Sequence, residues 1–357
     1  MQEALFYEKL DGDRVRCTLC ALDCRIRSGG RGACGVRVNR DGTLYTLVEN
    51  RIVARHIDPI EKKPLFHFLP GHASYSIGTV GCNFRCLHCQ NSGISQEPRL
   101  GSRAAESDEP DVVCPSLEDL DAAVPGERVT PAGLVQDAMV TGCRSLAYTY
   151  NEPTVFYELA LETSRQARDA GLANVFVTNG AITAPALERI APSLDAANID
   201  LKSFEPAGHQ RMTGAPLAPV LDSIRRYHEL GIWIEVTTLV IPGHNDSDEQ
   251  LRGIAGFILD VDPDIPWHVT RYHPSFRLRD RPPTPLETLR RAREIGREVG
   301  LRYVYTGNAP GEEGENTYCH ACGTELIRRF GLGIRGGRLA GGRCPKCRTS
   351  IPGVFDA

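Results

Sequence analysis

Six short apolar segments, separated by longer amphipathic ones, constrain the fold of this chain most strongly. Each is continuously apolar rather than alternating, as expected for parallel strands that are covered on both faces. The segments are "YSIGTV" (75–80), "SLAYTY" (145–150), "NVFVTN" (174–179), "AANIDLK" (196–202), "IWIEVTTLVI" (232–241) and "WHVTRY" (267–272). Helical patterns lie between them, one of which ends at Gly231. This alternation predicts an α/β fold with a parallel sheet, either open and doubly wound or closed into a full or partial barrel.

The cysteine-rich ends divide the chain into three parts. We expect an N-terminal cysteine-rich module over residues 1–70, a core over 71–310 with "RYVYTGN" as a possible seventh strand, and a C-terminal zinc-ribbon-like module over 311–357. In the N-terminal module, "TLYTLVENRIVARHI" predicts paired strands. An acidic insertion over 101–126, rich in Ser, Pro and Ala, predicts a solvated and disordered segment, in which we expect no catalytic role for Cys114.

Charge and hydropathy patterns exclude several classes of protein. The net charge of −4, with acidic and basic residues nearly balanced, argues against a general binder of nucleic acids or anionic membranes. The first residues lack the basic start and apolar run of a signal peptide, and no stretch has the length of a membrane span. We therefore expect a cytoplasmic protein, in which the 13 cysteines stay reduced.

All cysteines except Cys114 and Cys143 fall into three groups with the spacing of metal ligands. The C-terminal group pairs Cys319-x2-Cys322 with Cys344-x2-Cys347 across a Gly-rich, hairpin-like spacer. Two such pairs predict a closed, structural zinc site with four thiolates.

The N-terminal group is Cys17-x2-Cys20-x3-Cys24-x9-Cys34, with glycines that allow sharp bends. Four thiolates hold either a zinc ion or an iron–sulfur cluster, and spacing does not separate the two. We favour a structural zinc, with a second cluster as the alternative.

The central group, Cys82-x3-Cys86-x2-Cys89 in "GCNFRCLHCQN", has only three thiols. It follows the first predicted strand, so we place it at the carboxyl edge of the sheet, where active sites of strand–helix barrels form. Three thiolates ligate three irons of a four-iron cluster and leave one iron open for a substrate or cofactor. The alternative is a zinc site completed by His88 or by a distant residue.

This spacing resembles the cluster loop of the radical S-adenosylmethionine (SAM) superfamily. The resemblance implies a partial (β/α)6 TIM-like barrel and a 4Fe–4S cluster whose open iron is chelated by SAM. In that superfamily one electron from the cluster cleaves SAM to methionine and a 5′-deoxyadenosyl radical, which abstracts hydrogen. A reductant such as ferredoxin or flavodoxin is implied as electron donor.

The resemblance also implies SAM-binding roles for polar residues at the carboxyl ends of the predicted strands. His88, in a position usually held by an aromatic residue, is expected near the adenine. Glu152, with Tyr150 and Asn151 beside it, matches the position that binds the SAM ammonium. The other expected SAM contacts are Thr178, Asn179, Asp200, Lys202 and His273.

Segments along the whole chain, among them "DPIEKKPLFHFLPG", "YTYNEPTVF" and "GNAPGEEGENTYC", resemble the AmmeMemoRadiSam-system radical SAM enzymes. These are relatives of pyruvate formate-lyase activating enzymes, which implies a glycyl-radical-type activase as one possibility and a small-molecule substrate as another. AMMECR-family and MEMO-family proteins are the partners that this resemblance implies.

Three hypotheses remain beside this one. Lys62, Lys63, His67 and His72 either line a substrate mouth or form a solvated approach to the first strand, and we favour the solvated approach. His244 and Asp246, in "IPGHND", are candidates for a turn near the site. A non-catalytic zinc module that binds a partner is the remaining alternative for the whole chain, and its lack of a basic stripe argues against nucleic acid as that partner.

Overall fold

A computed structural model describes residues 2–96, 117–337, 339 and 341–355. Its largest element is an eight-stranded sheet with the order β16-β15-β14-β13-β12-β11-β9-β8. All neighbours are parallel except β8 and β9, which are antiparallel. The strands are β8 (Ala54–Pro59), β9 (Ala73–Gly78), β11 (Ser145–Tyr148), β12 (Ala173–Thr178), β13 (Ala196–Asp200), β14 (Trp233–Val240), β15 (Trp267–Arg271) and β16 (Val304–Gly307).

The parallel sheet predicted from the apolar segments is confirmed, and the possible seventh strand is present as β16. Every residue of β11 is buried, as the continuous apolar pattern predicts for a strand covered on both faces. The sequential order is that of a barrel, but within the described residues β8 and β16 are not hydrogen-bonded to each other. Closure as a partial barrel therefore remains a prediction.

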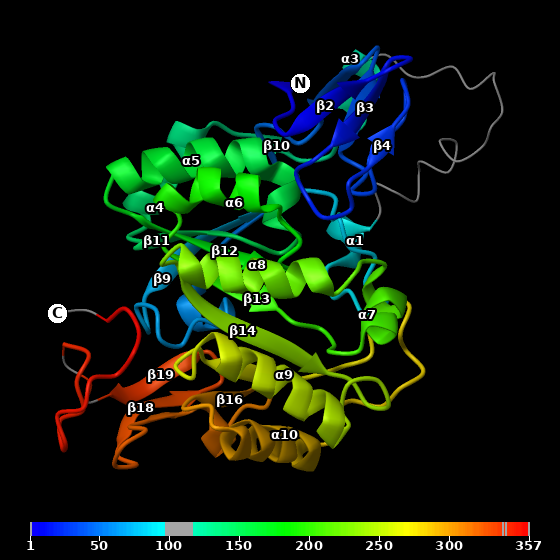
Figure 1. Cartoon of the computed structure of the whole chain (residues 1–357). Helices are drawn as coiled ribbons and strands as arrows, with labels where there is room; N and C mark the ends of the chain where they lie inside the picture. The colour runs from blue at the N-terminus through cyan, green and yellow to red at the C-terminus, as the bar shows by residue number, and fades with distance from the viewer. Residues whose placement is uncertain (1, 97–116, 338, 340, 356–357) are drawn as a thin grey trace.

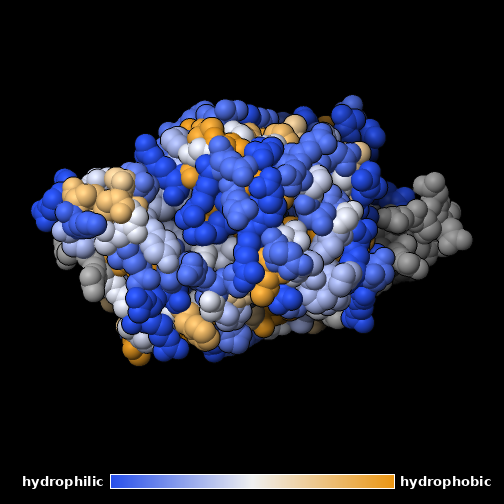
Figure 2. Space-filling model, turned by 90° about the horizontal axis from the view of Figure 1, so that it is seen from below, coloured by the Kyte–Doolittle hydropathy of each residue, from blue (hydrophilic) through white to orange (hydrophobic). Residues whose placement is uncertain are grey.

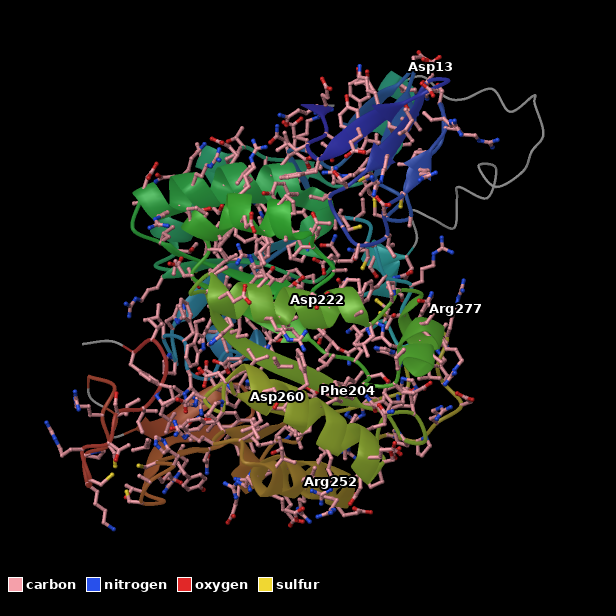
Figure 3. All side chains as sticks on the ribbon, in the orientation of Figure 1. Asp13, Phe204, Asp222, Arg252, Asp260 and Arg277 are labelled. Atoms are coloured by element: carbon pink, nitrogen blue, oxygen red, sulfur yellow. The ribbon has the colours of Figure 1, made fainter. Side chains whose placement is uncertain are left out.

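Helices follow the strands and cover the outer face of the sheet (Figure 1). In α8, the residues Val220, Ile224 and Tyr227 are buried at helical spacing, and Gly231, at φ 75°, follows the helix end as expected. Charged side chains such as Asp222 of α8 and Arg252 of α9 face outward (Figure 3). The helices are α1 (Ser92–Ser95), α3 (Leu117–Ala123), α4 (Pro131–Val140), α5 (Tyr157–Asp169), α6 (Ala184–Ile190), α7 (Pro206–Thr213), α8 (Ala218–Glu229), α9 (Asp248–Val261) and α10 (Leu286–Val299).

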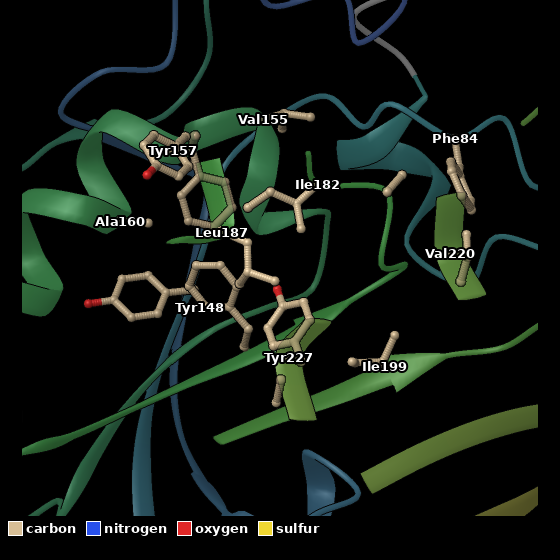
Figure 4. Close-up of a cluster of buried hydrophobic side chains, with 14 of the residues drawn as sticks. Phe84, Tyr148, Val155, Tyr157, Ala160, Ile182, Leu187, Ile199, Val220 and Tyr227 are labelled. Carbon is tan, nitrogen blue, oxygen red and sulfur yellow. The ribbon is translucent and has the colours of Figure 1, made fainter. Parts of the chain in front are cut away.

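A buried cluster of hydrophobic side chains joins the sheet to these helices (Figure 4). Tyr148 of β11 lies against Leu187 of α6 and Tyr227 of α8 in this cluster, and none of the three is more than 1% exposed. The hydroxyl of Tyr157, in α5, donates to the carbonyl oxygen of Ala186 at 2.8 Å. Burying large apolar side chains of this kind contributes about 1.5–3 kcal/mol each, so the cluster fixes the helices on the sheet.

The N-terminal segment forms two antiparallel three-stranded sheets at the upper right of Figure 1. One contains β1 (Gln2–Glu3), β5 (Arg37–Arg40) and β6 (Thr43–Thr46), and the other β2 (Tyr7–Leu10), β3 (Arg14–Cys17) and β4 (Arg25–Ile26). Their buried residues share one hydrophobic core with the large sheet. Phe6, for example, packs edge-on against Tyr157 of α5 with ring centroids 5.3 Å apart.

Two sequence-based expectations for neighbouring segments are corrected. The strands predicted to pair with one another within 43–57 instead pair elsewhere: β6 with β1 and β5, β7 (Arg51–Ile52) with β10 (Glu127–Arg128), and β8 with β9. Residues 97–116 of the acidic region, including Cys114, lie outside the described residues. Its later part is not wholly solvated, because Leu120 of α3 and Val124 are 4% and 9% exposed and belong to the core.

The segment between β8 and β9 occupies the inner face of the large sheet. Its residues Ile60, Leu65 and Phe68 pack against Ala147, Val175 and Ala196, whose small side chains leave room for it. The backbone N–H groups of Phe66 and His67 donate to the buried carboxylate of Glu235 in β14, at 2.9 and 2.7 Å. The prediction of a solvated approach is therefore wrong for Lys63, His67 and His72, which are 1%, 0% and 9% exposed. Their burial depends on partners in β8, β11 and the C-terminal segment, which local sequence does not reveal.

The C-terminal segment also contacts this inner segment. It forms a sheet of β17 (Thr317–Tyr318), β18 (Glu325–Phe330) and β19 (Gly333–Gly337) at the lower left of Figure 1, which confirms the expected hairpin. From β18, the buried Arg329 donates to the carbonyl oxygen of Phe66 at 2.9 Å and to Thr317 Oγ1 at 2.7 Å. Its guanidinium also lies 4.2 Å from the centre of the Phe66 ring.

Within the described residues, no helix combines the length and the apolar character that crossing a membrane requires. The face shown in Figure 2 is mainly hydrophilic, with small, separate hydrophobic patches.

Replacing Glu235 with Ala should strongly destabilise the fold. Its carboxylate accepts four hydrogen bonds, the other two from Trp233 Nε1 at 3.1 Å and His268 Nε2 at 2.7 Å. Removing it leaves buried donors unpaired, so we expect a loss of about 3–5 kcal/mol. Glu188→Ala, which breaks the exposed Arg226 pair, should cost at most about 1 kcal/mol. Urea unfolding followed by circular dichroism under anaerobic conditions measures both, and equal midpoints would contradict the assigned role of Glu235.

Candidate functional site

A cavity of about 740 Å³ lies where the parallel strands end. Residues at or beyond the carboxyl ends of β9 and of β11–β16 line it, as expected for this type of sheet. Its volume lies in the upper part of the usual range for ligand pockets, about 300–1,000 Å³. Of the residues predicted to form the site, the cavity is lined by Cys82, Cys86, His88, Cys89, Asn151, Glu152, Thr178, Asn179, Asp200 and Lys202.

The loop after β9 carries the three cysteines to the cavity wall. Phe84, between the first two cysteines, is 1% exposed and lies in the hydrophobic cluster near Val220 (Figure 4). The backbone N–H groups of Arg85 and Leu87 donate to the carbonyl oxygens of Thr213 and Met212 of α7. The loop is therefore anchored both by the burial of Phe84 and by hydrogen bonds to α7.

Asn151 holds the start of this loop. Its Oδ1 accepts from the backbone N–H of Thr79 at 3.1 Å, and its Nδ2 donates to the carbonyl oxygen of Gly81 at 2.8 Å. Sequence reasoning grouped Asn151 with the SAM contacts and missed this positioning contact, because the pairing of β9 with β11 is not local in the sequence.

Glu152 is a buried carboxylate with an almost complete set of donors. Its Oε1 accepts from Thr154 N, Thr154 Oγ1 and Thr178 Oγ1 at 3.0, 2.6 and 2.8 Å, whereas its Oε2 accepts from the backbone N–H of Asn179 at 2.8 Å. Burial raises the pKa of Glu152, and these hydrogen bonds oppose the rise. The Oε2 atom retains capacity for a further donor from a ligand.

Asp200 and Lys202, after β13, form an ion pair with a distance of 2.9 Å between Oδ2 and Nζ. Burial alone would lower the pKa of Lys202, but the charges of Asp200 and of Cys86 raise it instead. A cation therefore lies beside the cysteines, where it stabilises thiolate charge.

His88 is buried, and neither of its ring nitrogens has a hydrogen-bond partner among the residues that the structure describes. Burial, followed by the charges of Lys202 and His244, lowers its pKa to about 3. The neutral ring thus presents two polar atoms and a flat face in the cavity wall. Asn83 Nδ2 is also buried and unpartnered, and both residues fit a site that receives a polar ligand.

Three of the candidate residues do not reach the cavity wall. His273 is exposed in the loop after β15 and is not among the lining residues. His244 and Asp246 are half-buried and are also absent from the lining residues. Their turn is held by Asn245, whose Oδ1 accepts from Ile241 N at 2.7 Å and whose Nδ2 donates to the carbonyl oxygen of Lys202 at 2.9 Å.

The mouth contains a charged network that includes Lys62 and Lys63, both of which line the cavity. Asp58 of β8 binds both lysines, at 2.8 and 2.7 Å, and accepts a hydrogen bond from Tyr150 Oη at 2.6 Å. Burial alone would raise the pKa of Asp58, but these three donors together lower it. Burial lowers the pKa of Lys63 to about 8, with Asp58 opposing the decrease.

Sequence reasoning missed a second group of polar residues in the cavity. Thr237, His268 and Thr306, from β14, β15 and β16, face it, and His268 is oriented by Glu235. Within the described part of the chain, buried oxygens of Thr237, Thr306 and Glu61 have no hydrogen-bond partner, so this part of the wall has free capacity for hydrogen bonds. These three residues lie within strands rather than after them, so the search for polar residues after predicted strands did not find them.

Asn151→Ala should loosen the cysteine loop in the metal-free protein. Loss of the bonds to Thr79 and Gly81 leaves buried backbone groups unpaired, at a cost of about 1–3 kcal/mol. We therefore expect Cys82 to react with iodoacetamide roughly tenfold faster, as measured by peptide mass spectrometry. Asn308→Ala is the matched control, because Asn308 also lines the cavity but bonds to the carbonyl oxygen of Arg271. An unchanged rate for Asn151→Ala would argue against its positioning role.

Comparisons with known proteins agree with this geometry. The sequence profile of the Radical SAM superfamily matches residues 76–253. An uncharacterised protein of Methanocaldococcus jannaschii is 44% identical over 331 residues, which cover 92% of each chain. The pyruvate formate-lyase-activating enzyme of Staphylococcus aureus is 23% identical over 202 residues, 56% of this chain and 74% of that enzyme.

A solved domain of pyruvate-formate lyase-activating enzyme from Bacteroides vulgatus aligns with a TM-score of 0.41 and 18% identity, covering 46% of this chain and 99% of that one. From the profile and the sequence relatives, this chain belongs to the radical SAM superfamily and is homologous to pyruvate formate-lyase activating enzymes.

Proposed function

We propose that this chain binds a 4Fe–4S cluster through Cys82, Cys86 and Cys89 and cleaves SAM reductively to start a hydrogen abstraction. One observation carries the proposal. Among the described cysteines, those three line the cavity, and they face polar groups from the ends of successive strands. Three thiolates leave one iron of such a cluster open, which is the arrangement of a reactive rather than a structural metal site.

The donor set fits both groups. Soft thiolates suit an iron–sulfur cluster, and the nearby Lys202 offsets their negative charge. Glu152 Oε2 is an acceptor for the ammonium of SAM, whereas His88 offers its ring face and unpartnered nitrogens to the adenine. When bound, the cluster and SAM supply a 5′-deoxyadenosyl radical that removes a hydrogen atom from the substrate.

The residues of this chain position the reactants and exclude water. Glu152 fixes Thr178 and the backbone of Asn179, whose Nδ2 in turn donates to Asn83 Oδ1 at 2.7 Å and lies 3.9 Å from Cys82 Sγ. One hydrogen-bonded chain thus joins the proposed SAM side of the cavity to the cluster loop. The wall formed by Thr237, His268 and Thr306 is left for the substrate.

The homology to activating enzymes favours a protein as substrate, with a one-electron donor of the ferredoxin or flavodoxin type. We propose AMMECR-family and MEMO-family proteins as partners, because the sequence resemblance implies them. A glycyl radical on a partner protein, detected by electron paramagnetic resonance (EPR) after incubation with this enzyme and SAM, supports the activase hypothesis. Hydrogen abstraction from a small molecule alone would contradict it.

Cys86→Ala should abolish the formation of 5′-deoxyadenosine from SAM and dithionite, because two thiolates do not hold the cluster in place. Cys143→Ala is the matched control: Cys143 is also buried but lies outside the cavity lining. Its activity should stay within about twofold of wild type, since small core substitutions usually leave a distant site intact. Anaerobic chromatography of the products measures both, and wild-type turnover in Cys86→Ala would refute the assignment.

We also propose that the C-terminal cysteines hold a structural zinc ion. The Sγ atoms of Cys319 and Cys347 are 3.5 Å apart, those of Cys322 and Cys344 are 3.7 Å apart, and all four lie within 4.8 Å of one another. Tetrahedral zinc with bonds of about 2.3 Å requires thiolates roughly 3.8 Å apart. Iron–sulfur chemistry is not needed to explain this site.

Removing the C-terminal zinc should therefore destabilise the hairpin more than the central core. In Cys322→Ala, we expect the loss of about one zinc per chain and faster proteolysis within residues 319–350, because a structural zinc contributes directly to local folding. Inductively coupled plasma mass spectrometry and limited trypsin digestion measure these effects, with Cys143→Ala as control. An unchanged zinc content would contradict the proposal.

A further inference from the structure

The four N-terminal cysteines surround a second, smaller cavity. Cys17 is the last residue of β3, Cys24 directly precedes β4, and Cys20 forms a β-bridge with Ile182. With Cys34 they line one cavity, together with Leu19, Leu22, Gly32, Ala33, Arg37, Thr154 and Val155. The thiols therefore face a shared space with mainly apolar walls.

The N-terminal thiols are arranged differently from the four thiols of the C-terminal site. In the part of the chain that the structure describes, only the C-terminal cysteines form a group whose ligand atoms all lie within 4.8 Å of one another. Neither the N-terminal thiols, which surround a cavity, nor the three thiols of the central loop form such a compact group. One zinc ion draws its thiolates to about 3.8 Å, whereas each thiolate of a four-iron cluster binds a different iron and lies farther from the others.

The surroundings suit a negatively charged cluster. The buried guanidinium of Arg37 lies between Cys17 Sγ, at 3.7 Å from Nη1, and the carboxylate of Glu158, with which it forms a salt bridge. The backbone N–H of Ala33 donates to Cys24 Sγ at 3.4 Å. Hydrogen bonds and positive charge near the sulfurs stabilise the reduced form of an iron–sulfur cluster. Because they suit thiolate-bound zinc as well, the spacing of the thiols decides between the two.

We propose that Cys17, Cys20, Cys24 and Cys34 hold a second four-iron cluster rather than a zinc ion. With a thiolate on every iron, no position is open for SAM, so the chemistry available to this cluster is the gain and loss of one electron.

The second site lies directly beside the central loop. A Cβ atom added to Gly81, the residue before Cys82, would be 2.8 Å from the carbonyl oxygen of Cys34. Thr154, which lines the N-terminal cavity, donates to Glu152 of the central one. An electron from a ferredoxin- or flavodoxin-type donor that reduces the second cluster thus arrives next to the central loop.

Metal and sulfide analysis of the full chain, reconstituted anaerobically with iron, sulfide and zinc, tests the inference. Wild type should bind about eight irons, eight sulfides and one zinc per chain. The decisive variant is Cys82→Ala/Cys86→Ala/Cys89→Ala, which leaves the N-terminal site intact. It should keep about four irons, with a Mössbauer spectrum of a four-iron cluster and an EPR signal after reduction by dithionite.

Cys20→Ala/Cys24→Ala is the reciprocal variant and should keep about four irons in the central site. About four irons and two zinc ions in wild type, with no iron in the triple variant, would overturn the inference. That result, together with formation of 5′-deoxyadenosine, would leave the proposed SAM chemistry standing. Eight irons without SAM cleavage would instead support the second cluster and count against the proposed function.

Discussion

The buried carboxylate of Glu235 is the interaction on which the inner structure depends. Four N–H donors converge on it from β14, β15 and the segment between β8 and β9. A buried charge without such partners would cost several kcal/mol, so the carboxylate requires all of these elements to be in place together. Burial alone would raise the pKa of Glu235, but His268 and the other donors hold it below its usual value.

This constraint also shapes the cavity. By fixing Phe66 and His67, Glu235 fills the inner face of the sheet near its middle, so that open space remains toward the carboxyl ends. The same carboxylate orients His268, which also lines the cavity. The two sides of the cavity thus have different origins. One side is a loop that is anchored by Asn151 and α7. The other side is a set of strand residues, among which His268 is held by Glu235.

Sequence patterns were sufficient for features that depend on local composition. Continuous apolar runs gave the parallel strands, and cysteine spacing indicated three groups, one of which the structure brings within zinc distance. Polar residues after strands led to Glu152, Thr178 and Asp200, because parallel strands bring their carboxyl ends together. His273 follows the same pattern, but it is exposed in the loop after β15 and does not line the cavity.

Features that depend on contacts between distant segments were not predictable in this way. The segment "KKPLFHFLPG" does not predict that Phe66 forms hydrogen bonds with Glu235 and Arg329, which lie 169 and 263 residues away. The burial of Lys63 likewise depends on Asp58 and Tyr150. The difference between the N-terminal and C-terminal cysteine sites is also a three-dimensional property, because both have four thiols at ligand spacing.

The contact between Arg329 and Phe66 has a consequence for how the protein is made. Synthesis on the ribosome proceeds from the N-terminus, at about 5–20 residues per second. The carbonyl oxygen of Phe66 therefore has no contact with its donor until Arg329, 263 residues later in the chain, has been synthesised. Until then the inner segment lacks one of its anchors, and contacts of such long sequence separation form slowly. The inner segment is thus completed only when two parts of the chain that lie 263 residues apart in the sequence come together.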